Sequence, residues 1–250
     1  MVSALALPFV FVTLLWFFST GAILWANRLP RETHPGAIVA ATPLAGAAVC
    51  ALIVSAIETS TAAAYLAFSS ALVVWGWHEM SFLMGFVNGS SQAPLAPGVR
   101  GWARFRASAA TVIHHEVALA VTLVALIALS WGAPNQTGPL TFALLFALRL
   151  SAKLNIFLGV RSLSHDLMPD HLAYLKTHFR ERRFNMLFPV SVTASVMLAM
   201  ILAGHAVTSP AAALLLALTL LGILEHGFMM INWRDSALWT WANPNLRTKA

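Results

Sequence analysis

The chain has 250 residues, of which 59% are hydrophobic and 10% are charged, and its formal net charge is +6. Soluble domains carry about 25% charged residues, so a soluble protein of this composition could not cover its surface. Lipid must therefore be the solvent for much of the chain. The one cysteine, Cys50, excludes an internal disulfide and a Cys-x-x-Cys metal or redox motif.

Apolar runs recur along the chain, each long enough to supply the roughly 20 helical residues that a bilayer core requires. Seven such runs are found, at 4–26, 37–57, 62–87, 109–131, 139–160, 185–207 and 210–232. Helices are favoured because each one satisfies its backbone hydrogen bonds within its own segment. The sequence therefore predicts an all-α polytopic integral membrane protein, a bundle of about seven transmembrane helices, with residues 1–250 forming a single domain.

The basic residues are concentrated in alternate connections between these runs. Thirteen of the fifteen Lys and Arg residues lie in the first, third and fifth connections and in the C-terminal tail. Because basic loops remain on the cytoplasmic side, the N-terminus is expected in the periplasm and the C-terminus in the cytoplasm. Topology and attraction to anionic lipid account for the basic character, so no nucleic-acid partner is expected.

The fifth connection, residues 161–184, is the longest polar segment. Its apolar residues follow helical spacing, at Met168, Leu172, Leu175 and Phe179. Asp166 and Pro169 stand at the expected start of this helix. We expect a basic amphipathic helix on the cytoplasmic surface, serving either as a membrane anchor or as a docking surface for a partner.

Ionisable residues within the predicted spans gather at one depth. With a rise of about 1.5 Å per residue, those of four spans lie roughly 8–12 Å from the cytoplasmic end. The candidate site residues are His78, Glu79, His115, Glu116, Glu225 and His226, with His114 and His171 as secondary candidates. Arg149 and Lys153 are four residues apart, and we expect them to act as charge partners on one helix face.

Three interpretations of this polar layer are open. The glutamates and the two cations can form a buried ion-pair network that only fixes helix packing. Carboxylates and histidines from four helices can instead hold iron or another divalent metal, as in helical di-iron proteins, although the spans lack Glu-x-x-His pairs. A histidine can also ligate the magnesium of a chlorin, with Trp and Phe side chains as flat apolar walls.

Several stretches together resemble one known family. They are WGWHEMSFLMGF, PGVRGWARFR, RLSAKLNIFLGVR, PDHLAYLKTHFR, NMLFPVSVT and LEH. Over about residues 10–232 the chain resembles the purple-bacterial photosynthetic complex assembly proteins known as PuhE. The resemblance implies a multi-pass protein of the inner or intracytoplasmic membrane of phototrophic bacteria. It brings no assignment of active-site residues.

The resemblance also implies a function and partners. The leading hypothesis is an assembly factor for the reaction-centre and light-harvesting complex, acting through bacteriochlorophyll supply or handling. Its partners would be the lipid bilayer, subunits of that complex or pigment-synthesis proteins. The alternative is a membrane-bound, di-iron-like oxygenase acting on a lipophilic pigment, carotenoid or quinone, so the sequence leaves enzymatic activity open. A proton-coupled transporter fits less well, because transporter sites lie near the bilayer midplane.

Overall fold

The computed structural model describes residues 2–163, 168–231 and 235–243. Its α-helices are α1 (Val2–Asn27), α2 (His34–Ala56), α3 (Thr61–Leu83), α4 (Gly101–Ala110), α5 (Ile113–Leu129), α6 (Thr137–Leu158), α7 (Leu187–His205) and α8 (Pro210–Phe228). The 3-10 helices are η1 (Arg31–Thr33), η3 (Asp170–His178) and η4 (Asp235–Trp239). The predicted all-helical class is confirmed for these residues, whose β pairing amounts to one isolated bridge between Val160 and Glu181.

Several of the described helices could cross a membrane. Five are long and apolar enough, namely α1, α2, α6, α7 and α8, and a sixth span results if α4 and α5 count as one. The 23-residue α3, which carries His78 and Glu79, is not among them. Seven crossings, as predicted from the sequence, would require both α3 and α5 to cross as well.

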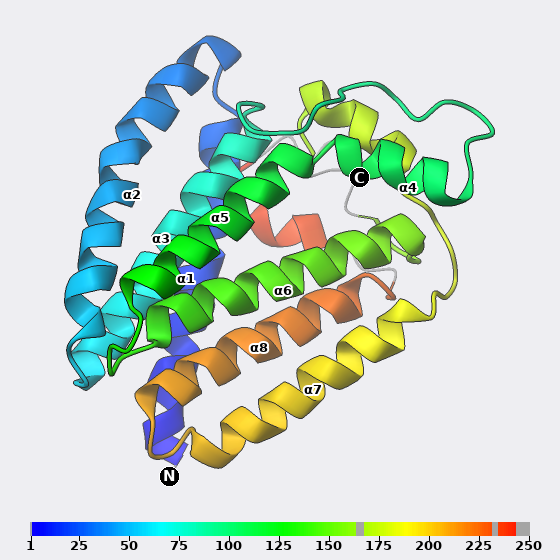
Figure 1. Ribbon diagram of the computed structural model, residues 1–250. Helices are drawn as coiled ribbons and strands as arrows, with labels where there is room; N and C mark the ends of the chain where they lie inside the picture. The colour runs from blue at the N-terminus through cyan, green and yellow to red at the C-terminus, as the bar shows by residue number, and fades with distance from the viewer. Residues whose placement is uncertain (1, 164–167, 232–234, 244–250) are drawn as a thin grey trace.

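Helices α3, α6 and α8 form the centre of the bundle, and α2 and α7 lie at its edges (Figure 1). In the most apolar window of α8, 56% of residues are buried, compared with 6% in α7. The main core cluster joins α1, α3, α6 and α8 through Val12, Phe68, Leu144 and Leu214. Polar residues on α3, α6 and α8 therefore tend to meet one another.

Serine caps begin two of the helices. The side chain of Ser60 accepts a hydrogen bond from the backbone nitrogen of Ala63 at 3.2 Å, which caps α3. The side chain of Ser209 accepts one from Ala212 at 3.3 Å, and Pro210 follows it in the first turn of α8. Both arrangements satisfy backbone donors that a helix start leaves free.

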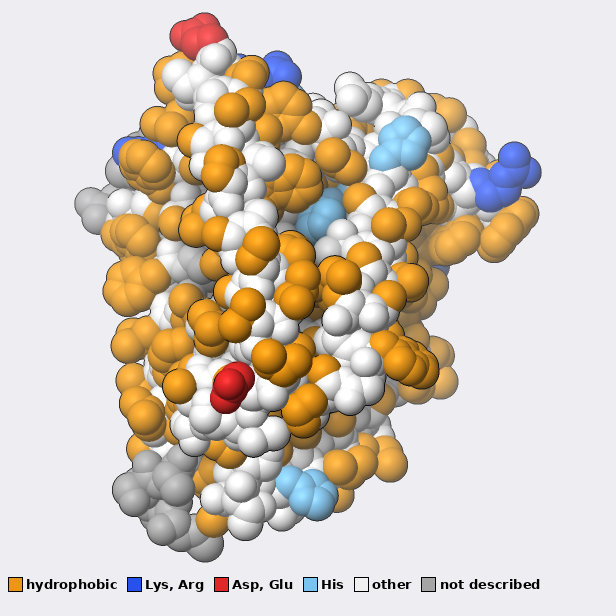
Figure 2. All heavy atoms as spheres, turned by 60° about the vertical axis from the view of Figure 1, so that its left-hand side comes forward, with side chains coloured by type: hydrophobic (Ala, Val, Ile, Leu, Met, Phe, Trp, Pro, Cys, Tyr) orange, Lys and Arg blue, Asp and Glu red, His pale blue; other side chains and the backbone are white. Residues whose placement is uncertain are grey.

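The connections gather at two ends of the bundle. At the first end, the backbone nitrogen of Leu95 donates to Oγ1 of Thr177 at 2.8 Å, joining two distant connections. At the opposite end, Nδ2 of Asn135 donates to the carbonyl of Ser55 at 2.9 Å. We name the first end, formed by residues 28–36, 84–112, 159–163 and 168–186, the basic end, because these segments contain ten Lys and Arg residues. Figure 2 shows one face of the bundle, largely covered by hydrophobic side chains, with Lys and Arg only in its upper part.

Two segments differ from their predicted form. Within 161–184, residues 170–178 form the 3-10 helix η3 and not an amphipathic α-helix, while Asp166 lies outside the described residues. The predicted run 109–131 contains a break at residues 111–112, where α4 and α5 meet at 69°. Both segments contact the connection after α3, through Leu95 and Gly89 respectively.

The C-terminal residues 235–243 fold back onto α1. Nε1 of Trp239 donates to the carbonyl oxygen of Phe17 at 3.2 Å, and the two rings stack with centroids 6.2 Å apart. Trp241 lies against Gly21, where a β-carbon would overlap its indole. The glycine therefore permits a close approach between the first helix and the last described segment.

Candidate functional site

Two ion pairs link α3 and α5 to the central helix α6. Nη2 of Arg149 donates to Oε2 of Glu79 at 3.1 Å. Nζ of Lys153 donates to Oε1 of Glu116. Because Arg149 and Lys153 are four residues apart, they project from the same side of α6. One helix thus supplies the cations, and two neighbouring helices supply the carboxylates.

His115 is fully buried beside these ion pairs, with 0% of its surface exposed. Its Nε2 lies 3.9 Å from Oε1 of Glu79, beyond hydrogen-bond distance, and its ring packs on Phe82 with centroids 4.7 Å apart. Neither ring nitrogen has a hydrogen-bond partner among the described residues, nor does Oε1 of Glu79 or Oε2 of Glu116. We call Glu79, Glu116, His115, Arg149 and Lys153 together the cluster. An unsatisfied buried polar group costs about 1–3 kcal/mol. The cluster therefore has buried nitrogen and oxygen atoms whose hydrogen bonds no described residue supplies.

The break between α4 and α5 orients His115 toward the bundle. Its backbone nitrogen donates to the carbonyl of Asn88 at 3.0 Å. The neighbouring Gly89 lies so close to the break that a β-carbon there would overlap the carbonyl oxygen of Ala110. The connection after α3 therefore packs directly on the start of α5, where His115 turns inward and His114 stays exposed.

The two candidate residues of α8 face different neighbours. Nε2 of His226 shares a hydrogen bond with Oγ of Ser151 at 2.9 Å, and its Nδ1 shares one with a backbone carbonyl of its own helix at 2.8 Å. Glu225 accepts a hydrogen bond from Nε1 of Trp16 at 3.1 Å and also interacts electrostatically with Arg149. The residues of α8 thus tie α6 and α1 to the cluster.

The cluster and Glu225 together contain more carboxylates than cations. Glu79, Glu116 and Glu225 face two cationic side chains, Arg149 and Lys153. Arg149 interacts electrostatically with all three carboxylates, and 44% of its side chain is exposed. With neutral histidines, one formal negative charge is in excess.

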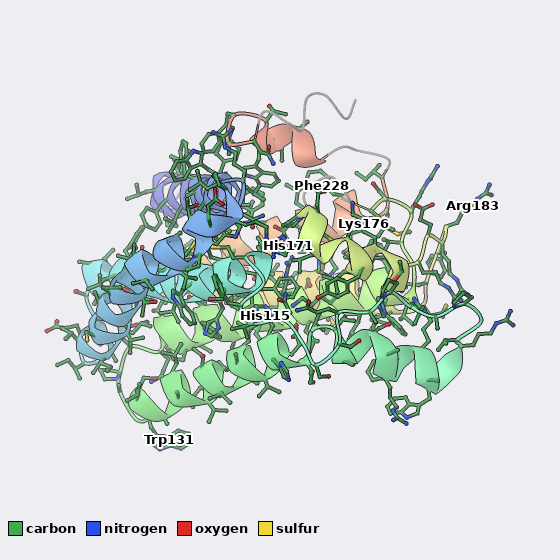
Figure 3. All side chains as sticks on the ribbon, turned by 90° about the horizontal axis from the view of Figure 1, so that it is seen from above. His115, Trp131, His171, Lys176, Arg183 and Phe228 are labelled. Carbon is green, nitrogen blue, oxygen red and sulfur yellow. The ribbon has the colours of Figure 1, made fainter. Side chains whose placement is uncertain are left out.

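The remaining candidates lie apart from the ion pairs. Nε2 of His78 shares a hydrogen bond with Oγ1 of Thr122 at 2.9 Å. Adjacent helical residues differ by about 100° in direction, which explains why His78 and Glu79 meet different groups. His114 is exposed on α5. His171 lies in η3 at the basic end, and Figure 3 shows its position relative to His115 from above.

Sequence reasoning missed polar partners that the structure reveals. Ser151, Trp16 and Thr122 each hydrogen-bond to a candidate residue. Nδ2 of Asn155 donates to Oγ of Ser191 at 3.0 Å, which joins α6 to α7. Ser151 could have been found because it lies between the two cations on α6, and Asn155 lies in the sequence at the depth of the predicted polar layer.

The arrangement is a poor fit to a metal centre. Among the described residues, no three His, Cys, Asp or Glu side chains are placed to hold a metal ion. Two of the carboxylates are engaged by Arg149 and Lys153 instead. The geometry thus offers no specific support for the iron-dependent oxygenase hypothesis.

The fold and the cluster define a class: an all-helical protein with several helices suited to a bilayer and ion pairs between its central helices. The chain belongs to the family described as "Protein of unknown function (DUF3623)", whose model matches residues 1–250. It is 40% identical over 255 residues to a Rhodobacter capsulatus protein described as "Uncharacterized 30.4 kDa protein in puhA 5'region". That match covers 98% of this chain and 92% of the relative. No solved structure matches the chain.

Proposed function

We propose that this chain is a membrane assembly factor for the photosynthetic reaction-centre and light-harvesting complex, of the PuhE type that its sequence resembles. The observation that carries the proposal is the Rhodobacter capsulatus relative, which lies in the puhA region of a photosynthesis gene cluster. Bacterial genes that act together are commonly neighbours. An identity of 40% over nearly the whole chain supports a shared role.

The proposed topology has seven crossings of the inner or intracytoplasmic membrane, with a periplasmic N-terminus and a cytoplasmic C-terminus. The long helices alternate in direction, which supports this topology (Figure 1). The segments of the basic end contain ten Lys and Arg residues, whereas the opposite connections, 57–60, 130–136 and 206–209, contain none. Loops rich in Lys and Arg are retained on the cytoplasmic side.

In this proposal the ion-pair cluster fixes the packing of the central helices, and pigment handling takes place on the outer face of α5. His114 is exposed there, and Val117 and Val121 continue the same face with 51% and 62% of their surfaces exposed. His114 would hold the magnesium of a bacteriochlorophyll, and the exposed valines would pack against its flat apolar surface. His115 and His226 are buried, which leaves His114 as the more accessible histidine.

Gene replacement tests the assembly role. The gene of the Rhodobacter capsulatus relative is deleted, and this chain is expressed in its place. We expect the deletion to lower the near-infrared absorbance of the reaction-centre and light-harvesting complexes per milligram of membrane protein, and this chain to restore it. Unchanged absorbance in the deletion strain, with normal transcription of the neighbouring genes, would refute the assembly role.

Pigment titration tests the handling role separately. Bacteriochlorophyll is titrated into the purified protein in detergent, and the shift of its long-wavelength band is recorded. We expect saturable binding that His114→Leu removes. His205→Leu is the matched control, because His205 is exposed at the opposite end of the bundle. Equal binding by both variants would exclude His114 as the ligand while leaving the assembly role intact.

A further inference from the structure

Helix α4 is held at a fixed depth by one buried arginine. Nη2 of Arg104 donates to the carbonyl of Phe157 at 2.9 Å and to that of His178 at 2.8 Å. Its guanidinium also lies 4.0 Å from the centroid of the Phe157 ring. Because Phe157 is in the last turn of α6, these contacts hold α4 at the level where that apolar helix ends.

The direction and exposed surface of α4 suit a membrane interface. Its axis is bent by 69° from that of α5, and Figure 1 shows it projecting sideways from the bundle. Trp102 is 69% exposed and stacks on Phe105, with ring centroids 4.9 Å apart. Exposed tryptophans with apolar neighbours concentrate at the level of lipid headgroups.

Unneutralised positive charge surrounds this helix. Arg180 and Arg182 act electrostatically on Arg104, and Arg106 is exposed on α4. None of these four arginines forms an ion pair with another described residue, although Glu181 lies in the same segment. Arg104 is needed to bind the carbonyls of Phe157 and His178. Arg180 and Arg182 both act on Arg104, and these like charges repel one another unless an anion lies between them.

We propose that α4, together with Arg180 and Arg182, binds the phosphate headgroups of anionic phospholipids in the leaflet around the end of α6. The guanidiniums would contact the phosphates, and Trp102 and Phe105 would lie among the upper acyl chains. A soluble acidic partner would match the charge but not the exposed Trp102 beside the end of a membrane helix.

Lipid titration tests this site on the full-length protein in detergent micelles. Fluorescent phosphatidylglycerol and phosphatidylcholine are titrated separately into the wild type and into Arg106→Gln/Arg182→Gln. Each basic side chain near an anionic surface contributes about fivefold in affinity, so we expect the double variant to bind phosphatidylglycerol about 25-fold more weakly. Its phosphatidylcholine binding should be unchanged.

A matched control carries the same loss of charge elsewhere on the basic end. Arg28→Gln/Arg31→Gln removes two exposed arginines from the connection between α1 and α2. Its affinity for phosphatidylglycerol should stay within about twofold of the wild type, because salt screens electrostatic attraction beyond about 10 Å. Equal weakening in both double variants would overturn the proposal by showing a diffuse charge effect. Displacement of the lipid by millimolar inorganic phosphate would also overturn it, since the site would then be for a free anion.

Discussion

Lys153 and Arg149 lie on one side of α6 but differ in burial. The Lys153 side chain is 21% exposed, whereas that of Arg149 is 44% exposed. Removing one partner of a buried ion pair costs about 3–5 kcal/mol, because the other charge stays buried and unpaired. The carboxylates that would be left unpaired, Glu79 and Glu116, are both largely buried, with side chains 12% and 16% exposed.

Lys153→Met and Arg149→Met are therefore each expected to lower the free energy of unfolding by about 3–5 kcal/mol. Unfolding in mixed micelles with increasing dodecyl sulfate measures both. A loss below about 1 kcal/mol, the value of an exposed pair, would contradict this expectation for the variant that shows it.

The ion pair itself can be tested with a double variant. Glu116→Gln/Lys153→Met removes both charges, and replacing a whole buried pair is often neutral or stabilising. We expect the double variant to recover most of the stability that Lys153→Met loses. If the two single losses simply add, Glu116 and Lys153 act on different groups, and the contact between them contributes little.

The pKa of His171 responds to its position in η3 at the basic end. Burial lowers this pKa below its ordinary value, and the charges of Arg31 and His34 lower it further. A backbone hydrogen bond to Leu83 and the charge of Asp170 act in the opposite direction without cancelling the decrease. The folded protein thus favours the neutral imidazole.

The lowered pKa of His171 makes the docking of η3 depend on pH. When η3 detaches, the pKa of His171 returns to about 6.5, so the detached form takes up a proton first as the pH falls. Docking of η3 should be strongest above pH about 6.5 and should weaken below it. Hydrogen exchange of residues 170–178, corrected for intrinsic rates, should show more frequent opening at low pH, and His171→Gln should remove the trend. Opening that increases with pH would reverse the assigned sign.

At the scale of elements, the C-terminal segment depends on a glycine of α1. A side chain at Gly21 would overlap Trp241, whereas a β-carbon at Gly36 of α2 meets nothing within 4 Å. Gly21→Leu should therefore release residues 235–243 from α1, and Gly36→Leu should not. Limited proteolysis in detergent, read by mass spectrometry, should show faster cleavage near the C-terminus in the first variant alone. Unchanged cleavage in Gly21→Leu would show that the tail docks without Trp241.

The long helices could be predicted from apolar run length, because a bilayer leaves the backbone few alternatives. The meeting of Glu79, Glu116, Arg149 and Lys153 also followed from their similar depth. The depth of a residue in the membrane does not, however, determine which way its side chain points. His114 and His115 are adjacent, and which of them faces inward depends on the contact between Asn88 and the start of α5.

The elements that could not be predicted are held by contacts between distant segments. The 3-10 geometry of η3 accompanies hydrogen bonds to the connection after α3, such as that between Thr177 and Leu95. The break before α5 depends on the close approach of Gly89. The docking of Trp239 on Phe17 spans nearly the whole chain. Helical or strand periodicity contains no information about such contacts.

At the scale of the whole molecule, the proposed topology predicts which ends face which compartment. In a Cys50→Ser background, Thr59→Cys and Thr208→Cys should react with a membrane-impermeant maleimide added to the periplasmic side. Arg28→Cys and Arg183→Cys should react only after the cells are lysed. Figure 3 shows Arg183 projecting from the edge of the molecule, so access should not limit its reaction. Labelling of all four positions in intact cells would contradict the seven-crossing arrangement.

The contact between the tail and α1 has a consequence for biosynthesis. The two contact partners are 222 residues apart in the sequence, so α1 is synthesised long before Trp239 is available to cover Phe17. Until then the aromatic side chains around Phe17 are open to lipid or to other proteins. A reporter inserted directly after Asn243 would hinder this docking, whereas one placed on the N-terminal side of α1 would leave residues 235–243 free to dock.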